Sequence, residues 1–348
     1  MLTVTLADLR YRYRQFLIAV VGAGVVLAMG LLLSGLVGGF SAETNGTVAA
    51  VGANSWVLAN SSSGRIDAVG VFPQSQVAVV AATPGVTSAA PFILLPSQVA
   101  VVNGSSVSVN VVGVQVGGLG SPQVSGGSML SGSGQAVVDD AVGSTVGGVV
   151  HIGSATRHVV GTVSGRTLLG GAPVIYTSIA DAQAIAFGGA PFITTVITTG
   201  TPTSTAPGYT TFTSHQVVQN TLDSLSSATS SIDNSKILMW IVAGIIISAL
   251  LYVSALQRVR DFAVLKALGS NSASLFASLA TQAIIVSLIA ALFGAVLANF
   301  MGGIFSQPIA IPLDAYLTLP AIAVVVGLLS SLVALRRVTG ADPASAFG

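Results

Sequence analysis

The chain has 348 residues, of which 52% are hydrophobic and only 7% are charged. Soluble globular proteins carry roughly 25% charged residues, so this composition excludes an ordinary soluble protein and predicts one that lies in a membrane. The net charge of +1 gives no sign of nucleic-acid binding, and the absence of cysteine excludes disulfide bonds.

Residues 1–15 predict a short interfacial helix, with Leu2, Leu6 and Leu9 at helical spacing beside arginines. A charged anchor that only fixes orientation explains the same residues, and the sequence leaves both interpretations open. The following stretch, 16–40, is apolar and longer than the roughly 7–15 residues of a signal-peptide core. It therefore predicts a first membrane span rather than a cleavable leader.

Residues 41–211 differ in composition from the rest of the chain and predict a β-rich α+β domain. Short alternating runs such as 106–111 are rich in valine and serine, and glycine pairs punctuate them at turn spacing. Residues 178–187 instead predict a short helix, with Ser178 as its N-cap and Asp181 three residues later. At roughly 190 residues, the segment between the first two spans is long enough to bury a core of its own.

A hydrolytic or metal site in this domain has little support. Its candidate residues are His151, His158, His215, Asp139 and Asp140. None of the motifs HExxH and GxSxG, and no His/Cys ligand spacing, occurs around them. Histidines that are solvated, or satisfied within the core, are the favoured interpretation.

Residues 212–235 predict a stalk helix that leads into the second span. The apolar positions step by 4, 3, 4 and 3, which is the period of a helix seam packed on another helix. These positions are Val218, Leu222, Leu225, Thr229 and Ile232. An amphipathic helix that lies on its own domain is the alternative interpretation.

Three further spans follow, at 236–257, 274–301 and 315–335, because each is free of charged residues except Lys236 at the start of the first of them, and each is long enough for the roughly 20 residues that a helix needs to cross a bilayer. A loop at 302–314 separates the last two, since glycines and prolines interrupt the apolar stretch there. The predicted architecture is thus an α+β membrane protein with one span, a large domain, a stalk helix and three more spans.

No Asp, Glu, Lys, Arg or His lies inside the predicted spans, with Lys236 only at the edge of the second, and this argues against ion-coupled carriers and voltage sensors. Small residues recur four apart, as in Gly35 and Gly39 and in the row Ala290, Gly294, Ala298 and Gly302. Such rows let helices approach closely. The polar residues of the spans are interpreted as interhelical hydrogen-bonding groups: Ser248, Gln282, Ser287, Asn299, Ser330 and Ser331.

The basic residues set the expected orientation. Eight of the twelve lie in three segments, at the N-terminus, in the 258–273 loop and in the 336–348 tail. Basic residues near span ends stay cytoplasmic, so both termini and the 258–273 loop are expected inside the cell. The 41–211 domain, the stalk and the 302–314 loop are then extracytoplasmic, and four spans return the chain to its starting side.

The sequence carries no site for ATP hydrolysis. A phosphate-binding loop needs lysine within GxxxxGK[ST], and neither Lys236 nor Lys266 follows a glycine. We therefore expect no catalytic, cofactor or metal residues in this chain. If ATP and Mg²⁺ are used, another chain must bind them.

The most specific local pattern is the run Arg258-Val-Arg-Asp-Phe-Ala-Val-Leu-Lys-Ala-Leu-Gly269. Its apolar residues Phe262, Leu265 and Leu268 step by three, Arg258 and Asp261 form an i, i+3 pair, and the final glycine suits a helix end. The run predicts a short cytoplasmic surface helix. Chemistry alone leaves open whether it docks a partner or lies on the membrane as an elbow.

This run resembles the signature of the FtsX-like/MacB-type permeases, the membrane subunits of a class of ABC transporters. The tail residues Asp342, Pro343, Ala346 and Phe347 also resemble that family, as do the β-rich segments 135–140, 156–163 and 174–183. The resemblance implies one span, a large extracytoplasmic domain and three spans. It also implies two permease copies and two cytoplasmic ATPase subunits.

What the resemblance further implies is a coupling helix that seats in the ATPase. Its residues would be Arg258, Arg260, Asp261, Phe262, Leu265, Lys266, Leu268 and Gly269. Such permeases extrude molecules, move lipids or lipoproteins, or switch a cell-wall hydrolase. The sequence thus predicts a permease subunit in the bilayer, with an extracytoplasmic partner or cargo. The rival hypotheses are a membrane-anchored sensor or scaffold that binds an envelope component, and an amino-acid-type importer.

Overall fold

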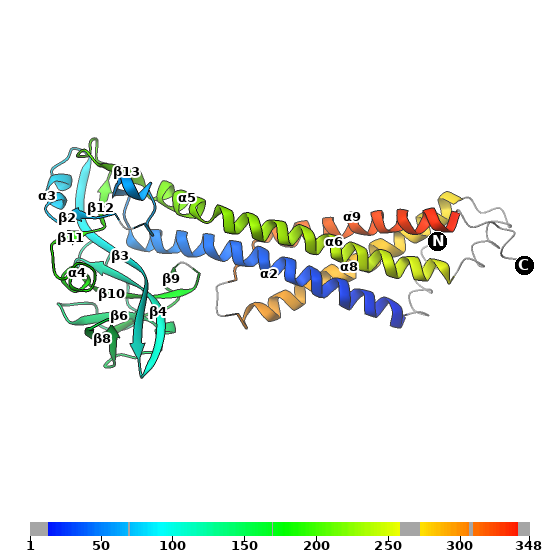
Figure 1. Cartoon of the computed structure of the whole chain (residues 1–348), viewed down its shortest axis with the longest axis horizontal. Coiled ribbons are helices and arrows are strands. Elements are labelled where there is room, and N and C mark those ends of the chain that lie inside the picture. Colours follow the sequence, from blue (N-terminus) through cyan, green and yellow to red (C-terminus); the bar gives the residue numbers. More distant parts are fainter. Residues whose placement is uncertain (1–12, 69, 169, 258–271, 306–308, 340–348) are drawn as a thin grey trace, which may run out of the picture. The chain divides into compact units, whose positions relative to one another are not determined.

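The computed structural model describes residues 13–68, 70–168, 170–257, 272–305 and 309–339. The chain divides into two compact units, each described here by itself (Figure 1). The helical unit comprises residues 1–38 and 228–348, and the β domain comprises residues 39–227.

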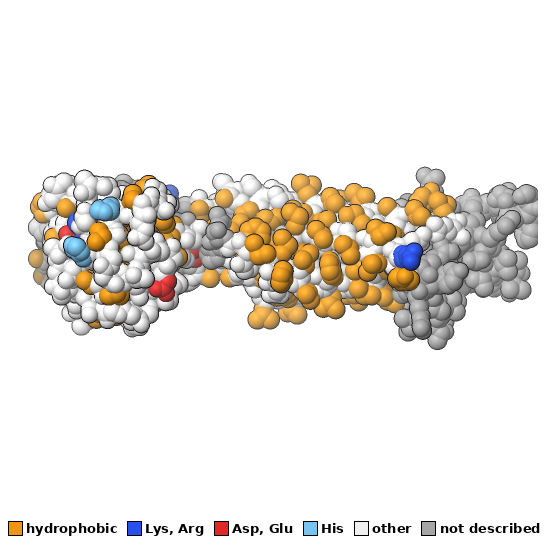
Figure 2. Space-filling view, turned by 90° about the horizontal axis from the view of Figure 1, so that it is seen from below, with side chains coloured by type: hydrophobic (Ala, Val, Ile, Leu, Met, Phe, Trp, Pro, Cys, Tyr) orange, Lys and Arg blue, Asp and Glu red, His pale blue; other side chains and the backbone are white. Residues whose placement is uncertain are grey.

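Four long helices carry the apolar stretches. They are α2 (Tyr13–Val51), α6 (Ser226–Leu256), α8 (Ser272–Gly302) and α9 (Leu313–Thr339). Among the described residues, α2 and most of α6 and α8 are long and apolar enough to cross a membrane, and α9 adds a shorter apolar stretch, Leu313–Leu329. Figure 2 shows hydrophobic side chains gathered over the helices on the face seen there. These helices agree with the predicted count of four spans.

The first helix is longer than the predicted span. It contains residues 13–15, which were assigned to the interfacial helix, and it continues beyond 40 without a break. It ends at Val51, where Gly52 follows with a φ of +70°. The helix thus continues past the predicted span boundary at 40/41, while the two compact units divide at 38/39. Residues 1–12 and the 340–348 tail lie outside the described residues.

Small residues hold the helical unit together, as the sequence predicted. A Cβ added at Gly294 of α8 would lie 2.8 Å from the carbonyl oxygen of Gly24 in α2, and one at Gly24 would lie 3.0 Å from the carbonyl oxygen of Ala290. Ala290 is fully buried. Gly35 also packs tightly, against Ile309 and Ile311 of the segment before α9. The glycines thus bring backbones into contact that larger residues would separate.

The β domain contains an 11-stranded sheet and a separate two-stranded one. The strands are β1 (Ser55–Ala59), β2 (Phe72–Pro73), β3 (Val86–Val102), β4 (Ser105–Val114), β5 (Gly126–Gly127), β6 (Gln135–Asp139), β7 (Val149–Ile152), β8 (Ala155–Val163), β9 (Thr167–Leu168), β10 (Ala172–Ser178), β11 (Phe192–Ile193), β12 (Thr195–Gly200) and β13 (Tyr209–Thr213). The main order is β13-β1-β12-β3-β4-β10-β6-β8-β5.

Six of these strands close into a ring. β3 pairs with β4, β4 with β10, β10 with β6, β6 with β8, β8 with β7, and β7 returns to β3. The 17-residue β3 takes part twice because it is irregular between Leu95 and Gln98, where Ser97 has a φ of +55°. Alternate side chains of the ring strands share one buried cluster, which includes Val111, Val138 and Ile175.

Helices cover both faces of the sheet. On the face of that cluster lie α3 (Gln76–Ala81) and α4 (Ile179–Phe187), and α4 is capped by Ser178, whose hydroxyl accepts a bond from the Asp181 amide. The predicted helix at 178–187 is therefore confirmed. On the other face, a second cluster takes in the last turns of α2 and the helix α5 (Ser214–Ser224).

Candidate functional site

The predicted coupling residues lie outside the described part of the chain. They are Arg258, Arg260, Asp261, Phe262, Leu265, Lys266, Leu268 and Gly269. The structure ends α6 at Leu256 and resumes at Ser272. The role of these residues stays a prediction, and the described geometry concerns how the membrane-type helices join the β domain.

The end of α2 is held in the β domain by a buried carboxylate. Glu43 is 8% exposed. Its Oε1 accepts bonds from the Thr167 hydroxyl at 2.5 Å and the Gly171 amide at 2.9 Å, while Oε2 accepts one from the Gly170 amide at 3.0 Å. The Thr47 hydroxyl donates to the Thr167 carbonyl at 3.2 Å. Bonds to an ionised acceptor are the stronger kind, so this cluster fixes the helix end to the 167–171 loop.

Apolar contacts continue the same joint. Val48 and Val51 of α2 are buried in the cluster that also holds Trp56 and Leu168. Residues 39–51 of α2 are thus part of the domain core rather than a free connector. The polar and the apolar contacts together attach one membrane-type helix to the sheet.

The second attachment lies at the start of α5. The Ser214 hydroxyl accepts a bond from Trp56 Nε1 at 3.0 Å and donates one to the Ala53 carbonyl at 2.7 Å. One residue earlier, Thr213 and Gln216 form a reciprocal capping box. This arrangement fixes where α5 begins and which way it leaves the sheet.

The middle of α5 is also bound to the domain. The Thr221 hydroxyl accepts a bond from the Ile66 amide at 3.2 Å and donates to the Val217 carbonyl at 2.7 Å. Thr221 and Val217 are completely buried, and Val218 is 4% exposed. A threonine at this position thus joins the helix to a loop far away in the sequence.

The predicted stalk seam is divided by the structure. Val218 and Leu222 pack on the core of their own domain, which is the arrangement of the alternative interpretation. Leu225, half-buried, is a one-residue interruption between α5 and α6, with φ −91° and ψ 2°. Ile232 is half-buried in α6. The stalk is therefore two helices in series rather than one continuous helix.

The polar residues in the helical unit behave differently from one another. Asn299 of α8 accepts a bond from the Tyr316 hydroxyl of α9 at 2.9 Å, so one interhelical bond is confirmed. The Ser331 hydroxyl instead bonds the Leu328 carbonyl of its own helix. Gln282 Nε2 and Ser287 Oγ are buried and have no hydrogen-bond partner in the described structure.

The histidines do not form a metal site within the described residues, where no group of three or more potential ligands occurs. His151, His158 and His215 are all exposed. Asp139 is buried and accepts bonds from the Ala141 and Arg166 amides, which is a structural cap. This agrees with the solvated interpretation of the histidines.

A buried ion pair stabilises the ring of strands. Arg157 of β8 and Asp181 of α4 lie 3.1 Å apart and are 8% and 7% exposed. The other carboxylate oxygen of Asp181 accepts bonds from the Gly134 amide and from the Thr177 and Ser178 hydroxyls. Because both carboxylate oxygens already have partners and the group is buried, the pair is interpreted as structural.

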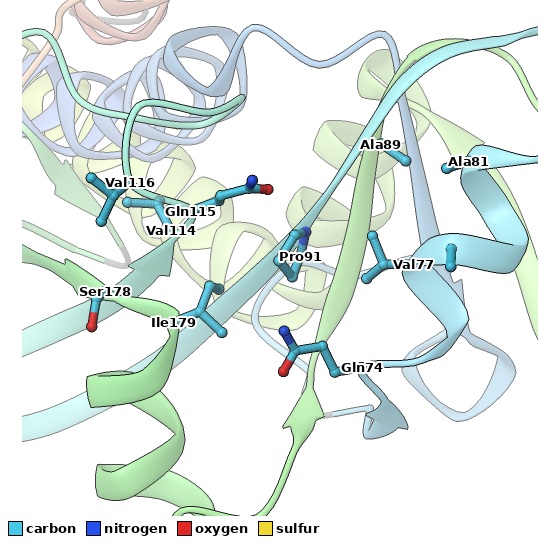
Figure 3. A pocket seen from close by; sticks show the side chains of 11 residues that line it. Gln74, Val77, Ala81, Ala89, Pro91, Val114, Gln115, Val116, Ser178 and Ile179 are labelled. Atoms are coloured by element: carbon cyan, nitrogen blue, oxygen red, sulfur yellow. The ribbon is translucent and has the colours of Figure 1, made fainter. Parts of the chain in front are cut away.

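Two of the hollows on the described part of the β domain bear on its possible function. The larger, of 630 Å³, lies between α3 and α4 (Figure 3). It is lined by Gln74, Val77, Ala78, Ala81, Ala89, Pro91, Val114, Gln115, Val116, Ser178 and Ile179, none of which is charged. It is a shallow, open hollow whose lining is mostly apolar with a few polar groups.

The other hollow, of 500 Å³, lies beside the last turns of α2 and contains Arg166 and Tyr176. Burial raises the pKa of the Tyr176 phenol, and the nearby Arg166 lowers it to a smaller extent. The phenol is therefore neutral at physiological pH.

Comparison with known proteins identifies the family. Residues 236–343 match the family described as FtsX-like permease C-terminal. An uncharacterized ABC transporter permease of Mycobacterium tuberculosis (strain ATCC 25618 / H37Rv) is 37% identical over 349 residues, which cover 100% of this chain and 99% of the relative. The chain belongs to the FtsX-like ABC transporter permeases. A second such permease of that strain is 36% identical over 348 residues, covering 100% and 99%.

Solved structures give a weaker likeness to this permease. The periplasmic region of MacB from Actinobacillus actinomycetemcomitans matches with a TM-score of 0.35 and 12% identity, covering 48% of this chain and 91% of that one. The extracellular domain of the noncanonic ABC-type transporter YknZ from Gram-positive bacteria matches with a TM-score of 0.33 and 14% identity, covering 42% and 83%. TM-scores this low support no conclusion about the permease.

Sequence reasoning missed the residues that attach the permease helices to the β domain. Glu43, Ser214 and Thr221 did not enter it. The signal for Glu43 was its place in an unbroken helical pattern that continues to Gly52. A carboxylate there needs donors, and the paired glycines at 170–171 supply them.

Proposed function

We propose that this permease couples ATP hydrolysis in a separate cytoplasmic ATPase to movement of its β domain outside the cell, for extrusion or mechanical signalling. The ATP and Mg²⁺ would be bound by the partner, and the chain itself would carry no catalytic residue. Both termini and the 258–273 loop would face the cytoplasm. A second permease copy would complete the complex.

The observation that carries the proposal is the double attachment of the β domain. One helix, α2, runs without interruption from Tyr13 to Val51 and ends in the buried Glu43 cluster. The other connection is α6 followed back through Leu225 to α5, which is fixed by Ser214 and Thr221. In this proposal, these contacts within the β domain pass a displacement of either helix on to the sheet.

The composition of the helical unit supports force transmission over transport of a charged solute through the bilayer. In the described parts of the helical unit, charged residues occur only near the helix ends. They are Arg14, Asp233, Lys236, Asp314, Arg336 and Arg337. Glycine contacts such as Gly24 with Gly294 pack α2 on α8. Closely packed helices move as rigid bodies.

The test is co-purification with a candidate ABC ATPase of the same organism, expressed together with this chain. We expect a stable complex with the wild-type chain. Replacing Phe262 and Leu265 by aspartate would remove the apolar face of the coupling loop, and we expect loss of the ATPase with normal membrane insertion. Aspartate at Leu2 and Leu6, in the basic N-terminal segment, is the control.

Retention of the ATPase by the doubly substituted loop would refute the coupling assignment. A chain that never binds an ATPase would instead support the sensor or scaffold hypothesis. Sidedness is tested separately: the chain has no cysteine, so Phe262→Cys gives a single labelling site. Labelling by an impermeant maleimide from outside intact cells would contradict the proposed orientation.

A further inference from the structure

One edge of β3 is left without a strand partner beside the larger hollow. β3 pairs with β4 from Phe92 to Val102 on one edge, and with β12 from Val86 to Phe92 on the other. Because β4 ends at Val114, opposite Phe92, the edge on the β4 side carries no described strand between Val86 and Pro91. Unpaired strand edges accept a further strand.

The backbone of Ala89 faces this open edge. Its cross-strand partner is Thr198 of β12, whose carbonyl accepts a bond from the Asn54 amide and therefore points toward β1. In an antiparallel pair, the backbone N–H and C=O groups of two directly opposed residues either point toward each other or both point away. Ala89 therefore points away from β12, with its N–H and C=O both toward the open edge.

The neighbouring residues agree with this alternation. The Phe92 carbonyl accepts from Thr194 Oγ1, and the Leu94 amide donates to the same hydroxyl, so these even-numbered residues face the β12 side. Pro91 has the same phase as Ala89 but no N–H to offer. The open edge thus presents the donor and acceptor of Ala89 and the acceptor of Pro91.

The hollow lies along this edge and is uncharged. Its residues Val77 and Ala81 on α3 and Ile179 at the start of α4 form two sides, as Figure 3 shows. The small Ala89 and Pro91 leave the space between those helices open. An apolar side chain fits such a space, and a charged one would be left without a partner.

Two carboxamides provide the remaining polar groups. Gln74 and Gln115 lie on two sides of Pro91 in Figure 3. The Gln74 oxygen already accepts a bond from Gln183 Nε2 at 2.8 Å, which leaves its amide group as a donor for an incoming group. Carboxamides match the donors and acceptors of a peptide backbone.

We propose that the β domain binds an extended, uncharged stretch of another polypeptide, which adds as a strand to β3 at Ala89 and inserts an apolar side chain into the hollow. The exposed backbone edge selects a peptide over a free hydrocarbon chain, since only a peptide pairs with both groups of Ala89. The inference adds a partner class to the proposed function. Its test needs no nucleotide, so its failure leaves the coupling proposal standing.

The test is equilibrium binding to the full chain in lipid nanodiscs, with empty nanodiscs as blank. The probe is a fluorescently labelled, acetylated and amidated peptide, Thr-Val-Thr-Val-Thr. The control peptide has the same side chains but carries N-methyl groups on alternate backbone nitrogens, so it lacks the N–H donors along one edge. We expect the unmodified peptide to bind with a Kd on the order of 0.1–1 mM and the N-methylated peptide at least about tenfold more weakly.

Variants locate the binding. Ala89→Pro removes one N–H from the open edge without breaking a bond to β12, and we expect affinity to fall about fivefold. Ala81→Glu places a carboxylate in the hollow and should weaken binding about tenfold or more. Val79→Glu is the matched control on the same helix, because Val79 is 54% exposed and does not line this hollow.

Three results would overturn the proposal: no binding of the probe, equal binding of the N-methylated peptide, or equal loss with Ala81→Glu and Val79→Glu. Unchanged affinity with Ala89→Pro would also contradict it. If that variant does not fold, the glutamate pair decides the question alone.

Discussion

The Glu43 cluster makes the sharpest quantitative prediction. In Glu43→Gln, the side-chain oxygen can keep the bonds from Thr167 and Gly171, but the amide group then faces the Gly170 N–H, which is a donor as well. A lost hydrogen bond to a charged group is worth about 2 kcal/mol. In Glu43→Ala all three donors lose their acceptor, and we expect about 3 kcal/mol.

Hydrogen–deuterium exchange of the amides of Gly170 and Gly171 measures this directly, since exchange reports local opening. A loss of 2 kcal/mol corresponds to roughly thirtyfold faster exchange, and 3 kcal/mol to roughly a hundredfold or more. The Gly170 amide should respond most strongly in Glu43→Gln, whereas both amides should respond in Glu43→Ala. The measurement is made on the full chain in nanodiscs and read in peptides that cover 167–174.

Asn45→Ala provides the control, because Asn45 is exposed and its side chain bonds only to Ser41 of the same helix. We expect it to change the exchange of the 167–174 peptides by less than about twofold. Exchange in Glu43→Ala that is no faster than in this control would show that the carboxylate does not hold the helix end, and the attachment argument would fail.

Two further substitutions test the packing of each unit. Gly294→Ala brings a Cβ to within 2.8 Å of the Gly24 carbonyl oxygen and should destabilise the helical unit by about 1–3 kcal/mol. Gly46→Ala meets nothing within 4 Å and should be neutral or stabilising. Thermal inactivation compares the two variants. Arg157→Leu leaves a buried carboxylate without its cation and should cost about 3–5 kcal/mol, measured as lost exchange protection in β8 and β10. The comparison variant Arg65→Leu removes a pair that is only partly buried and should cost less, about 1 kcal/mol.

The sequence was sufficient for the parts whose signal is local. The uncharged stretches predicted the apolar helices because backbone in lipid must be satisfied within a helix. Ser178 and Asp181 predicted the start of α4 because capping depends on residues three apart. The small-residue row at Ala290 and Gly294 predicted close helix packing for the same local reason.

The missed features depend on pairing between distant segments. Closure of the ring needs β7 to return to β3 across roughly 50 residues, and no local pattern encodes that. The extension of α2 into the domain depends on Glu43 meeting the 167–171 loop, more than 120 residues later. The open edge of β3 arises only from where β4 stops. All three features depend on which distant segments pair, and local secondary-structure propensity does not determine that.

The stalk illustrates an ambiguity that periodicity cannot resolve. A 4, 3, 4, 3 spacing of apolar residues fits a helix that packs on any apolar surface. Val218 and Leu222 meet the core of their own domain, while Leu225 interrupts the helix. The predicted seam contains the buried Val218 but not Val217 and Thr221, which are the most deeply buried residues of α5.

The most direct test of the central claim is single-molecule energy transfer on the complex with its ATPase. The absence of native cysteine allows Ser154→Cys, at an exposed turn of the β domain, to label each copy once. We predict that ATP and Mg²⁺ shift the transfer between the two copies, and that aspartate at Phe262 and Leu265 abolishes the shift. An unchanged transfer on adding ATP, in a complex that hydrolyses it, would contradict the account.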